Sequence, residues 1–351
     1  MRRTMKVAAL VAASALVLAA CGSNDDNASP SASGSSTSAK KSDVKVGLAY
    51  DIGGRGDKSF NDAAAAGLEK AKSEFGVETK ELEAKPGETD AQKEERLRLL
   101  AQGGYNTVIA VGFAYATALK KVAADFPDVH FAIVDDASIQ APNVADLVFA
   151  ENEGSFLVGA AAALKTKTNH VGFVGGVNVP LIQKFQAGFD AGVKAVNPDI
   201  KIDNKYLTQP PDFSGFQDPA KGKVAGQGMY QGGADVVFAA AGSSGLGVFQ
   251  AAKDANALAI GVDSDQYNTV DAALKDVILT SMVKKVDVAV YNFIQSVTKG
   301  SALSGTQTFD LKAGGVDYST SGGKVDDIKS KLDDFKQKII SGEIKVPDSV
   351  S

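Results

Sequence analysis

The sequence has few of the side chains on which catalytic and metal sites usually depend. Its 351 residues include one cysteine, two histidines and no tryptophan. The single cysteine, Cys21, has no partner for a disulfide within the chain and cannot form a site of several thiolates. His130 and His170 each begin an apolar run that predicts a strand, whereas ligands of parallel sheets bind beyond the carboxyl ends of strands. We therefore expect neither histidine to act as a base, and we expect no metal or other cofactor.

The usual enzyme signatures are also scarce. No G-x-S-x-G segment is present, so a serine hydrolase of that type lacks its nucleophile turn. The segment 281–284 matches the S-x-x-K pattern of penicillin-recognising enzymes, but no K-T-G follows it. The glycine-rich segment 242–247 differs in spacing from G-x-G-x-x-G, and no G-x-x-x-x-G-K-[ST] loop occurs. These features favour a binding protein over an enzyme.

The first twenty residues have the three parts of a secretory signal. Arg2, Arg3 and Lys6 precede the apolar run AALVAASALVLAA, which is short for a transmembrane helix. The following LAAC resembles a bacterial lipobox, in which Cys21 becomes the lipid-modified first residue of the mature protein. We therefore expect a signal peptide at residues 1–20 and a lipoprotein, carrying palmitate, on the extracytoplasmic face of the cell membrane. The alternative is an ordinary signal peptide with an incidental cysteine.

The segment after the signal predicts a tether. Residues 21–43 are rich in serine, glycine, asparagine and alanine, with almost nothing apolar to bury, so we expect a flexible linker. Loss of residues 1–20 removes three positive charges and changes the formal net charge from −5 to −8. An acidic protein is not expected to bind nucleic acid or to hold a membrane through a basic patch. Contact with the membrane is expected through the lipid anchor alone.

The folded region alternates apolar runs with segments of helical period. Eight strands are predicted, at residues 44–51, 107–112, 130–136, 145–151, 170–176, 201–207, 235–242 and 258–265. Capping residues support the helices between them: Ser59 with Asp62 at a start, Gly76, Gly103 and Gly232 at ends, and Pro127 and Pro198 beyond ends. Nearly continuous apolar strands that alternate with helices predict an α/β protein with parallel sheets covered on both faces.

The length of the folded region predicts two lobes rather than one. We expect the first lobe to include residues 44–150 and about 281–351, and the second to include residues 151–280. The segments 278–300 and 322–340 are predicted helical and are expected to return to the first lobe. A chain that crosses between lobes more than once forms a hinged cleft. We expect the protein to be a monomer.

Residues suited to ligand binding occur at the ends of the predicted strands. Six strands end in a residue that can bond a ligand or let the backbone approach one: Asp51, Gly112, Asp135, Gly175, Gly242 and Asp263. Turns favour aspartate and glycine in any case. Three carboxylates at strand ends in both lobes nevertheless predict a cleft lined with acceptors, which suits a polar, uncharged ligand.

The segment DIGGRGDKSFND, residues 51–62, joins the first predicted strand to a helix. The glycines allow the turn, and Ser59 with Asp62 is sufficient to begin the helix. Phe60 and Asn61 have no such local role, and they lie in the first helical turn, where backbone N–H groups are free. We therefore expect this loop to form one wall of the binding site.

Nine segments together carry a resemblance to a known family: the lipobox, DIGGRGDKSFND, FAIVDD, PNVADLVFAENEGSFLVGAAAAL, VGFVGG, SGFQDPAKGK, FAAAGSSGLGVFQAAK, IGVDSDQ and LTSMVKKVDVAV. From about residue 44 to 300 the chain resembles the basic membrane protein family of lipoproteins, substrate-binding components of ABC transporters that include purine nucleoside binders. The sequence pI near 5.3 does not suit the word "basic". The resemblance implies a type I periplasmic-binding-protein fold with three crossovers between lobes.

The resemblance also implies how a purine base would be held. Phe60 and Phe216 would stack on its two faces, and Asn61 and Asp135 would bond its edge. Phe213 lies near Phe216 in the sequence and is the alternative stacking ring. Asp136 follows Asp135 directly, and neighbouring strand residues point to opposite sides, so we expect one of the two to face the ligand and choose Asp135.

The sugar would be held at the other strand ends. By the same resemblance, Asp263, the backbone of Gly242 and Lys284 would bond the ribose hydroxyls, while Asp51 would line the cleft. A carboxylate can accept bonds from two neighbouring hydroxyls, and a buried carboxylate favours a nearby cation such as Lys284.

These expectations define a lipid-anchored solute-binding protein. It would capture a purine nucleoside such as guanosine, inosine or adenosine and deliver it to an ABC transporter permease, without making or breaking a bond. Two other ligand classes or activities stay open: a sugar or other small polyol, and a surface nucleoside hydrolase, although no opening D-x-D-x-x-x-D-D run is present. Adhesion or signalling through the same ligand-gated closure is a further alternative.

Overall fold

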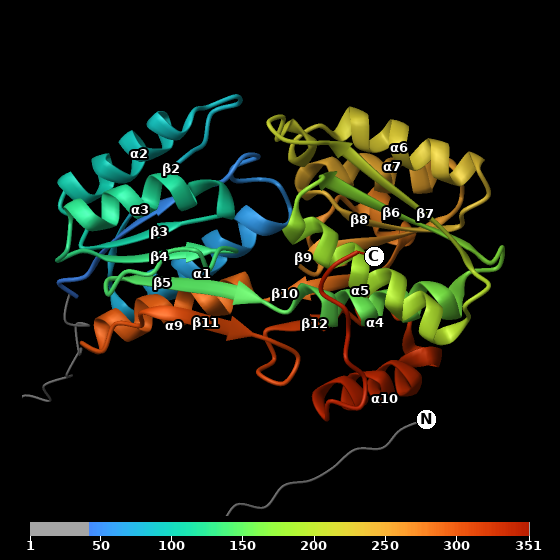
Figure 1. The fold of residues 1–351 in the computed structure, drawn as a ribbon. Helices are drawn as coiled ribbons and strands as arrows, with labels where there is room; N and C mark the ends of the chain where they lie inside the picture. The colour runs from blue at the N-terminus through green and yellow to red at the C-terminus, as the bar shows by residue number, and fades with distance from the viewer. Residues whose placement is uncertain (1–41, 351) are drawn as a thin grey trace, which may run out of the picture. The chain divides into compact units, whose positions relative to one another are not determined.

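The computed structural model describes residues 42–350, which form two lobes, each built on a six-stranded sheet (Figure 1). The predicted signal peptide, Cys21 and nearly all of the predicted tether lie outside the described residues. The first sheet has the order β11 (Gly305–Phe309), β5 (Val144–Phe149), β4 (His130–Val134), β3 (Thr107–Ala110), β1 (Lys45–Ala49) and β2 (Glu78–Leu82). The second has the order β12 (Val316–Tyr318), β10 (Ile278–Lys284), β9 (Leu258–Asp263), β8 (Val236–Ala240), β6 (His170–Val177) and β7 (Lys201–Thr208).

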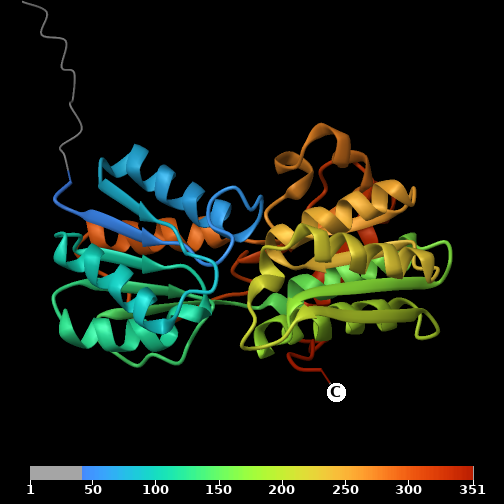
Figure 2. The same ribbon diagram turned by 90° about the horizontal axis from the view of Figure 1, so that it is seen from above.

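Helices cover both faces of each sheet, as the view from above shows (Figure 2). The first lobe carries α1 (Phe60–Phe75), α2 (Asp90–Gln102), α3 (Ala116–Asp125) and α9 (Val286–Thr298). The second carries α4 (Glu151–Lys165), α5 (Pro180–Val196), α6 (Pro219–Gln231), α7 (Gly245–Asp254), α8 (Gln266–Thr269) and α10 (Lys329–Ile340). Short 3₁₀ turns are η1 (Phe113–Tyr115), η2 (Ser214–Phe216), η3 (Gly242–Ser244), η4 (Ala272–Val277) and η5 (Asp326–Ile328). Among the described strands only β10 and β12 pair antiparallel, so the predicted α/β fold with parallel sheets is confirmed.

The apolar runs account for the strands that were predicted. β6 and β8 are buried along their whole length because helices pack on both faces of the sheet. β2 and β11 were missed because they are short edge strands with exposed or half-buried residues and no apolar pattern. The prediction of one helix over 278–300 is wrong, since residues 278–284 form the buried strand β10 between β9 and β12. The helix begins only at Val286.

The predicted helix ends agree with the structure. Gly76 ends α1 in the left-handed conformation, and Gly103 and Gly232 are the residues at which α2 and α6 end. Pro127 and Pro198 follow the last residues of α3 and α5, where a helix cannot continue through a proline. These signals are local, which is why the sequence alone is sufficient to locate them.

The chain passes three times between the lobes, at residues adjacent to one another. It leaves β5 for α4, returns from β10 to α9, and leaves β11 for β12. The Ala150 N–H donates to the Phe309 carbonyl at 3.0 Å, and the Lys285 N–H donates to the Gly315 carbonyl at 2.8 Å. The three crossovers are therefore tied into one hinge, with the number of crossovers that the family resemblance implied.

The tail of the chain differs from the expectation that residues 281–351 all return to the first lobe. α9 packs against α1 and β11 joins the first sheet, as expected. β12 instead pairs with β10 in the second sheet, and α10 packs on α4, with the rings of Phe335 and Phe156 5.4 Å apart. The expectation is wrong for these elements because a third crossover follows β11. The sequence contains no pattern that predicts this crossover.

Close packing of α4 against α5 positions two charged residues of the site. A Cβ on Gly188 would lie 2.1 Å from the Asn152 carbonyl, and a Cβ on Gly159 would lie 2.2 Å from the Phe189 carbonyl. Any larger side chain at these glycines would push the helices apart. The contact brings Lys184 of α5 next to Glu151, the first residue of α4.

Candidate functional site

All eight residues predicted from the sequence line one cavity between the lobes: Asp51, Phe60, Asn61, Asp135, Phe216, Gly242, Asp263 and Lys284. The cavity has space of about 60 Å³ for the centres of water molecules, and it lies at the carboxyl ends of strands from both sheets. Five of the six predicted strand-end residues line it. Gly175 does not, because β6 continues to Val177.

We call the part of the cavity around Lys284 the inner end. The Lys284 ammonium lies 2.6 Å from Asp135 Oδ2 and 3.4 Å from Glu151 Oε1, and 2% of its side chain is exposed. Burial lowers the pKa of Lys284, but the carboxylates of Asp135, Glu151 and Asp263 outweigh this effect and raise it above its usual value. Lys284 is therefore a permanent cation. Since Asp135 follows β4 and Lys284 ends β10, the ion pair joins the two lobes.

Aromatic rings surround this cation. The Lys284 ammonium lies 4.9 Å from the centre of the Phe60 ring, 5.1 Å from that of Phe149 and 5.5 Å from that of Phe185. Such contacts stabilise a buried cation through the negative face of each ring. Phe60 and Phe185 also line the cavity, so the same rings that surround the cation offer flat apolar walls to a ligand.

The two carboxylates at the inner end occupy strained backbone positions. Asp135 has φ +70° and Asp263 has φ +62°, a left-handed conformation that is uncommon for residues other than glycine. Burial raises the pKa of Asp135 to about 7 and raises that of Asp263 as well. Asp135 Oδ1 is buried without a hydrogen-bond partner. The inner end therefore presents at least one free acceptor next to a cation.

The structure separates Asp135 from its neighbour Asp136. Asp135 lines the cavity, whereas Asp136 accepts hydrogen bonds from the backbone and the hydroxyl of Ser138. The separation arises after β4 has ended at Val134, through the left-handed turn at Asp135. The choice of Asp135 as the residue that faces the cavity agrees with this geometry.

We call the part of the cavity around Asp51, at the beginning of the loop after β1, the outer end. Asn61 accepts a hydrogen bond from the Asp51 N–H at 3.0 Å and donates one to Asp57 Oδ2 at 3.0 Å. Asn61 is 1% exposed, so its amide is occupied within the loop. This geometry supports a role in positioning Asp51 rather than the base-edge contact that the resemblance implied.

The beginning of α1 corrects the predicted capping residue. The Ser59 side chain makes no cap bond. Asp57 accepts instead from the backbone N–H groups of Ser59, Asn61 and Asp62, at 2.9, 2.8 and 3.1 Å. These bonds lower the pKa of Asp57, but burial is the larger effect and raises it to about 6. The predicted position of the helix start is confirmed, because Ser59 directly precedes Phe60, the first residue of α1. Only the capping side chain differs: Asp57, two positions earlier, reaches the free N–H groups, which leaves the Ser59 hydroxyl available.

Ser59 uses its hydroxyl to join the lobes. Its Oγ donates to Asp263 Oδ2 at 2.8 Å and lies 3.1 Å from the Val262 carbonyl. The Ser264 hydroxyl donates to the Ser59 carbonyl at 2.9 Å, and the Gln266 amide donates to the Lys58 carbonyl at 3.0 Å. We call this group of interlobe bonds the latch. It holds the loop of the first lobe on the end of β9.

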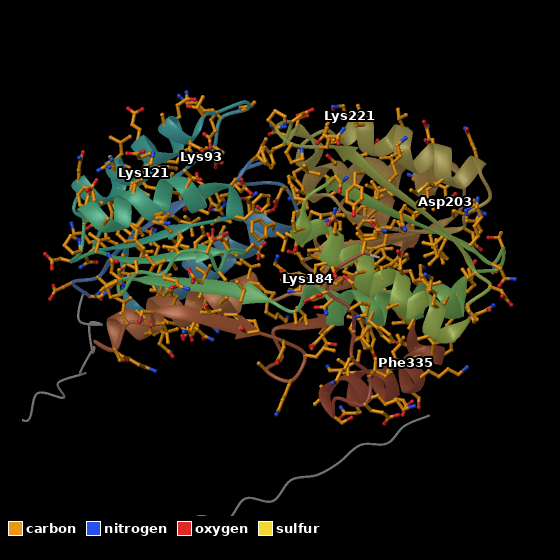
Figure 3. The ribbon with its side chains drawn as sticks, in the orientation of Figure 1. Lys93, Lys121, Lys184, Asp203, Lys221 and Phe335 are labelled. Atoms are coloured by element: carbon orange, nitrogen blue, oxygen red, sulfur yellow. The ribbon has the colours of Figure 1, made fainter. Side chains whose placement is uncertain are left out.

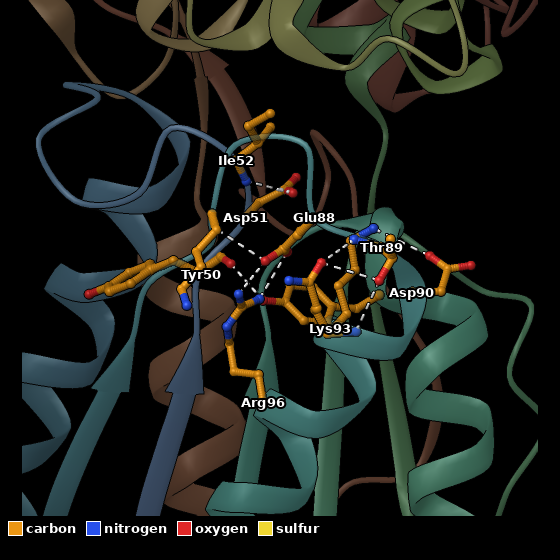
Figure 4. A network of polar contacts seen from close by, with 11 residues as sticks. Tyr50, Asp51, Ile52, Glu88, Thr89, Asp90, Lys93 and Arg96 are labelled. Carbon is orange, nitrogen blue, oxygen red and sulfur yellow. Dashed lines mark hydrogen bonds and ion pairs between the residues drawn. The ribbon is translucent and has the colours of Figure 1, made fainter.

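Asp51 at the outer end has neighbours different from those of Asp135. Its Oδ1 accepts from the Ile52 N–H at 2.8 Å, and its withdrawal from water raises its pKa to about 7 (Figure 4). Lys93 opposes this effect through its charge, although it makes no direct bond to Asp51. The strand before Asp51 is fixed by Tyr115, whose hydroxyl donates to the Tyr50 carbonyl at 2.7 Å.

The structure distinguishes the two candidate stacking rings. Phe216 lines the cavity, whereas Phe213 lines a neighbouring space and packs against Phe113, with ring centres 6.1 Å apart. Gly242, at φ +54°, lies so close that a Cβ would be 2.8 Å from the Phe216 carbonyl. The position of Phe216 therefore depends on glycine at residue 242.

Several contributors were not predicted, and Glu151 is the principal one. It is 1% exposed, lies within ion-pair distance of Lys284, and its Oε2 is 2.8 Å from the ammonium of Lys184 (Figure 3). Lys184 also donates to the Phe149 carbonyl at 2.5 Å. The sequence signal for Glu151 was only its place at the end of a strand, and its partners lie 33 and 133 residues away. Asp57, Phe113, Leu181, Ile182 and Phe185 also line the cavity without having been predicted.

The weak catalytic motifs do not assemble into a site. His170 lies at the amino end of β6, with its Nε2 2.7 Å from Asp203 at the far side of the second lobe (Figure 3). Ser281 is fully buried, and its Oγ accepts from the Gln266 N–H at 3.1 Å. Within residues 42–350, no group of three or more histidine, cysteine, aspartate or glutamate side chains could hold a metal ion.

No helix in this range is long and apolar enough to cross a membrane.

Two lobes, three crossovers and a cavity at the ends of the strands define a type I periplasmic solute-binding protein. A solved structure of this class, an ABC transporter solute-binding protein from Aeropyrum pernix K1, is 30% identical, covers 88% of this chain and 94% of its own, and has a TM-score of 0.76. The family model Bmp, described as "ABC transporter substrate-binding protein PnrA-like", matches residues 44–350. The chain belongs to this family of ABC transporter substrate-binding proteins.

Relatives with assigned names agree with the family. The CD4+ T-cell-stimulating antigen of Listeria innocua is 36% identical over 364 residues, with 99% of each chain covered. The "ABC transporter nucleoside-binding protein BmpA" of Lactococcus lactis subsp. cremoris is 35% identical over 367 residues, again with 99% of each covered. An uncharacterized lipoprotein of Pyrococcus furiosus is 36% identical, over 78% of this chain and 70% of its own. The family implies a small-molecule ligand and a permease partner, and its described role is transport rather than catalysis.

Proposed function

We propose that the protein captures a purine nucleoside, such as guanosine, inosine or adenosine, and delivers it to its ABC transporter permease. The observation that carries this proposal is the inner end of the cavity. There a free carboxylate oxygen of Asp135 lies beside a buried cation and between aromatic rings. The similarity to a relative named as nucleoside-binding supports the same ligand class.

The inner end suits the hydroxyls of a ribose. A carboxylate can accept hydrogen bonds from neighbouring hydroxyls, and Lys284 can donate one. The resemblance implied that Asp135 bonds the base edge, but we assign it to the ribose together with Asp263, because it lies beside Lys284. A site built on such bonds rejects a ligand that lacks the hydroxyls, because its buried polar atoms are then left unpaired. These residues therefore account for selection of an intact ribose.

The walls of the cavity suit a flat base. Phe60 and Phe216 both line it, one from each lobe, and Ile182 and Phe185 add apolar surface. Stacking of a base on an aromatic ring contributes about 1–3 kcal/mol in nucleic-acid sites. A purine base offers a flat face to each of two rings, so the pair of aromatic walls supports a nucleoside ligand.

Transport requires capture and release without chemistry. In the proposed cycle, ligand binds while the lobes are apart, and closure brings Ser59 to Asp263 and Asp135 to Lys284. The permease then distinguishes the closed form, which ligand favours because that form makes more contacts with it. The three-crossover hinge is the element that moves.

The decisive experiment is calorimetric titration of residues 42–351 with adenosine, inosine, guanosine and ribose, combined with chromatography of the mixture afterwards. We expect heat with at least one nucleoside, none with ribose, and full recovery of the nucleoside. Binding of a monosaccharide alone would establish the polyol alternative. Appearance of free base would establish the hydrolase.

The proposed location is the extracytoplasmic face of the cell membrane, through lipid on Cys21. Its support is the LAAC sequence and the relatives named as lipoproteins. Metabolic labelling with a radioactive palmitate should label the full chain, and Cys21→Ala should abolish the label and release the protein from the membrane fraction. An unlabelled wild-type chain would contradict the anchor.

A further inference from the structure

We propose that the protein also binds purine nucleosides that carry an aryl substituent on the six-membered ring of the base, and that a second chamber holds this substituent. The inference rests on the proposed function and specifies its ligand class. The chamber has space of about 280 Å³ for the centres of water molecules, compared with about 60 Å³ for the cavity itself. It therefore offers considerably more room than the cavity that it adjoins.

The chamber adjoins the outer end of the cavity. The two spaces share Asp51, Ile52, Phe113 and Phe216. They share none of the residues at the inner end: Asp135, Asp263 and Lys284 line the cavity but not the chamber. A ligand anchored at the inner end would therefore reach the chamber only with the part farthest from that anchor.

The chemistry of a purine nucleoside determines which part this is. The ribose is attached to the five-membered ring, and the atoms farthest from it are those of the six-membered ring, including the amino group of adenosine. With the ribose hydroxyls on Asp135 and Asp263, the six-membered ring faces Asp51 and the chamber. A substituent on the five-membered ring would instead lie beside the sugar and would not enter the chamber.

The lining of the chamber suits a flat, apolar substituent. Ile52, Pro86, Phe113, Pro211 and Phe213 contribute its apolar surface. Phe113 of the first lobe and Phe213 of the second pack 6.1 Å apart, at a tilt of 58°, and an aryl group between the lobes would contact both. Offset or tilted contacts of this kind add to the energy of burial.

The charged residues of the chamber are already satisfied or exposed, which disfavours an anionic substituent. Glu88 pairs with Arg96, and Lys93 lies 3.3 Å from Asp90. Lys85 is at the exposed rim. Since Asp51 and Glu88 both line the chamber, a phosphate there would face two carboxylates without an unpaired buried cation.

The first test compares three ligands by calorimetry: adenosine, N6-benzyladenosine and 8-benzylaminoadenosine. We expect N6-benzyladenosine to bind within about tenfold of adenosine, and the 8-substituted compound to bind at least about a hundredfold more weakly. Equal weakening of both substituted compounds would overturn the inference while leaving the proposed function intact. Failure of adenosine, inosine and guanosine alike would instead contradict the proposed function.

The second test fills the chamber. Ala114 lines it, and Ala114→Trp should weaken N6-benzyladenosine by about tenfold or more and leave adenosine nearly unchanged. Gln102→Trp, on the outer surface of α2 and away from both spaces, is the matched control and should change neither. Phe213→Ala enlarges the chamber and gives an independent measurement if the tryptophan variant does not fold. Loss of adenosine binding in parallel with that of the benzyl compound would contradict a separate chamber.

Discussion

The two ends of the cavity bury carboxylates in different ways. At the inner end, Asp135 pairs with the buried ammonium of Lys284, which also contacts Glu151. At the outer end, Asp57 accepts three backbone N–H groups and Asp51 accepts one, and neither makes an ion pair. The inner arrangement joins the two lobes, whereas the outer one organises a single loop. The comparison indicates that an ion pair adds to the latch where the lobes meet, whereas backbone bonding keeps the shape of the loop after β1.

The largest effect should follow from removal of the inner cation. Lys284→Met leaves Asp135 and Glu151 buried without their shared partner, and loss of one member of a buried pair costs about 3–5 kcal/mol. Denaturant unfolding should show this loss, and calorimetry should show no detectable nucleoside binding. Lys285→Met, at the next position, is the control and should change either quantity little. Wild-type stability of Lys284→Met would contradict the account of the inner end.

The second-largest effect is expected on nucleoside affinity rather than on stability. Asp263→Asn keeps the shape of the side chain and tolerates the left-handed backbone at this position, but removes the charge. We expect a loss of about a hundredfold in nucleoside affinity, since hydrogen bonds to charged groups contribute about 1.5–3 kcal/mol. His170→Ala, at the opposite end of the second sheet, should leave affinity unchanged. Equal losses in the two variants would contradict the location of the site.

The third prediction tests the outer end through the pH dependence of stability that Asp51 causes. Because the folded protein raises the pKa of Asp51 to about 7, the folded state binds this proton more tightly than the unfolded state does. The contribution of Asp51 to stability is therefore fully present below about pH 4 and is lost as the pH rises to about 7, by at most about 1.4 kcal/mol per pH unit. Asp51→Asn removes this dependence.

The measurement is the free energy of unfolding from pH 4.5 to 8, for the wild type and for Asp51→Asn. The difference between them should change between pH 4.5 and 7 in favour of the variant and become constant above pH 7. Asp136→Asn, whose side chain bonds Ser138 outside the cavity, is the control and should run parallel to the wild type. A constant difference for Asp51→Asn would show that its pKa is not raised.

The smallest effect should follow from loss of the latch hydroxyl. Ser59→Ala removes one hydrogen bond between the lobes, a change of about 1 kcal/mol in the balance between closed and open forms. X-ray scattering of the ligand-free protein should show a larger radius of gyration. The beginning of α1 should keep its helicity, because Asp57 caps it. Ser59→Thr keeps the hydroxyl and should resemble the wild type, whereas an unwound α1 in Ser59→Ala would contradict the role given to Asp57.

The sequence was sufficient for the parts of the site that depend on local pattern. Asp51, Asp135 and Asp263 follow apolar runs, and the carboxyl ends of parallel strands meet in space, so their shared location was predictable. The strand β10 was not, because a short buried apolar run has no period that separates strand from helix. Its assignment as a strand depends on the neighbouring strands that pair with it.

Residues whose role depends on distant partners were also beyond prediction. Glu151 resembles an ordinary acid at the first turn of a helix until α5 brings Lys184 beside it. Ser59 and Asp57 both suit a helix start, and only the turn geometry decides that Asp57 takes the cap. The same turn brings the Asn61 amide into hydrogen bonds with Asp51 and Asp57, so these bonds were not predictable either.

The point at which the chain enters the fold has a mechanical consequence. β1 begins at Lys45, at the amino end of the first sheet, whereas the cavity lies at the carboxyl ends of the strands. A pull on the segment before Lys45 is therefore borne by the hydrogen bonds of β1 with β2 and β3, within one lobe. None of this load crosses the latch or the hinge. A protein held to a surface by that segment could thus open and close its second lobe freely, with the first lobe as the fixed support.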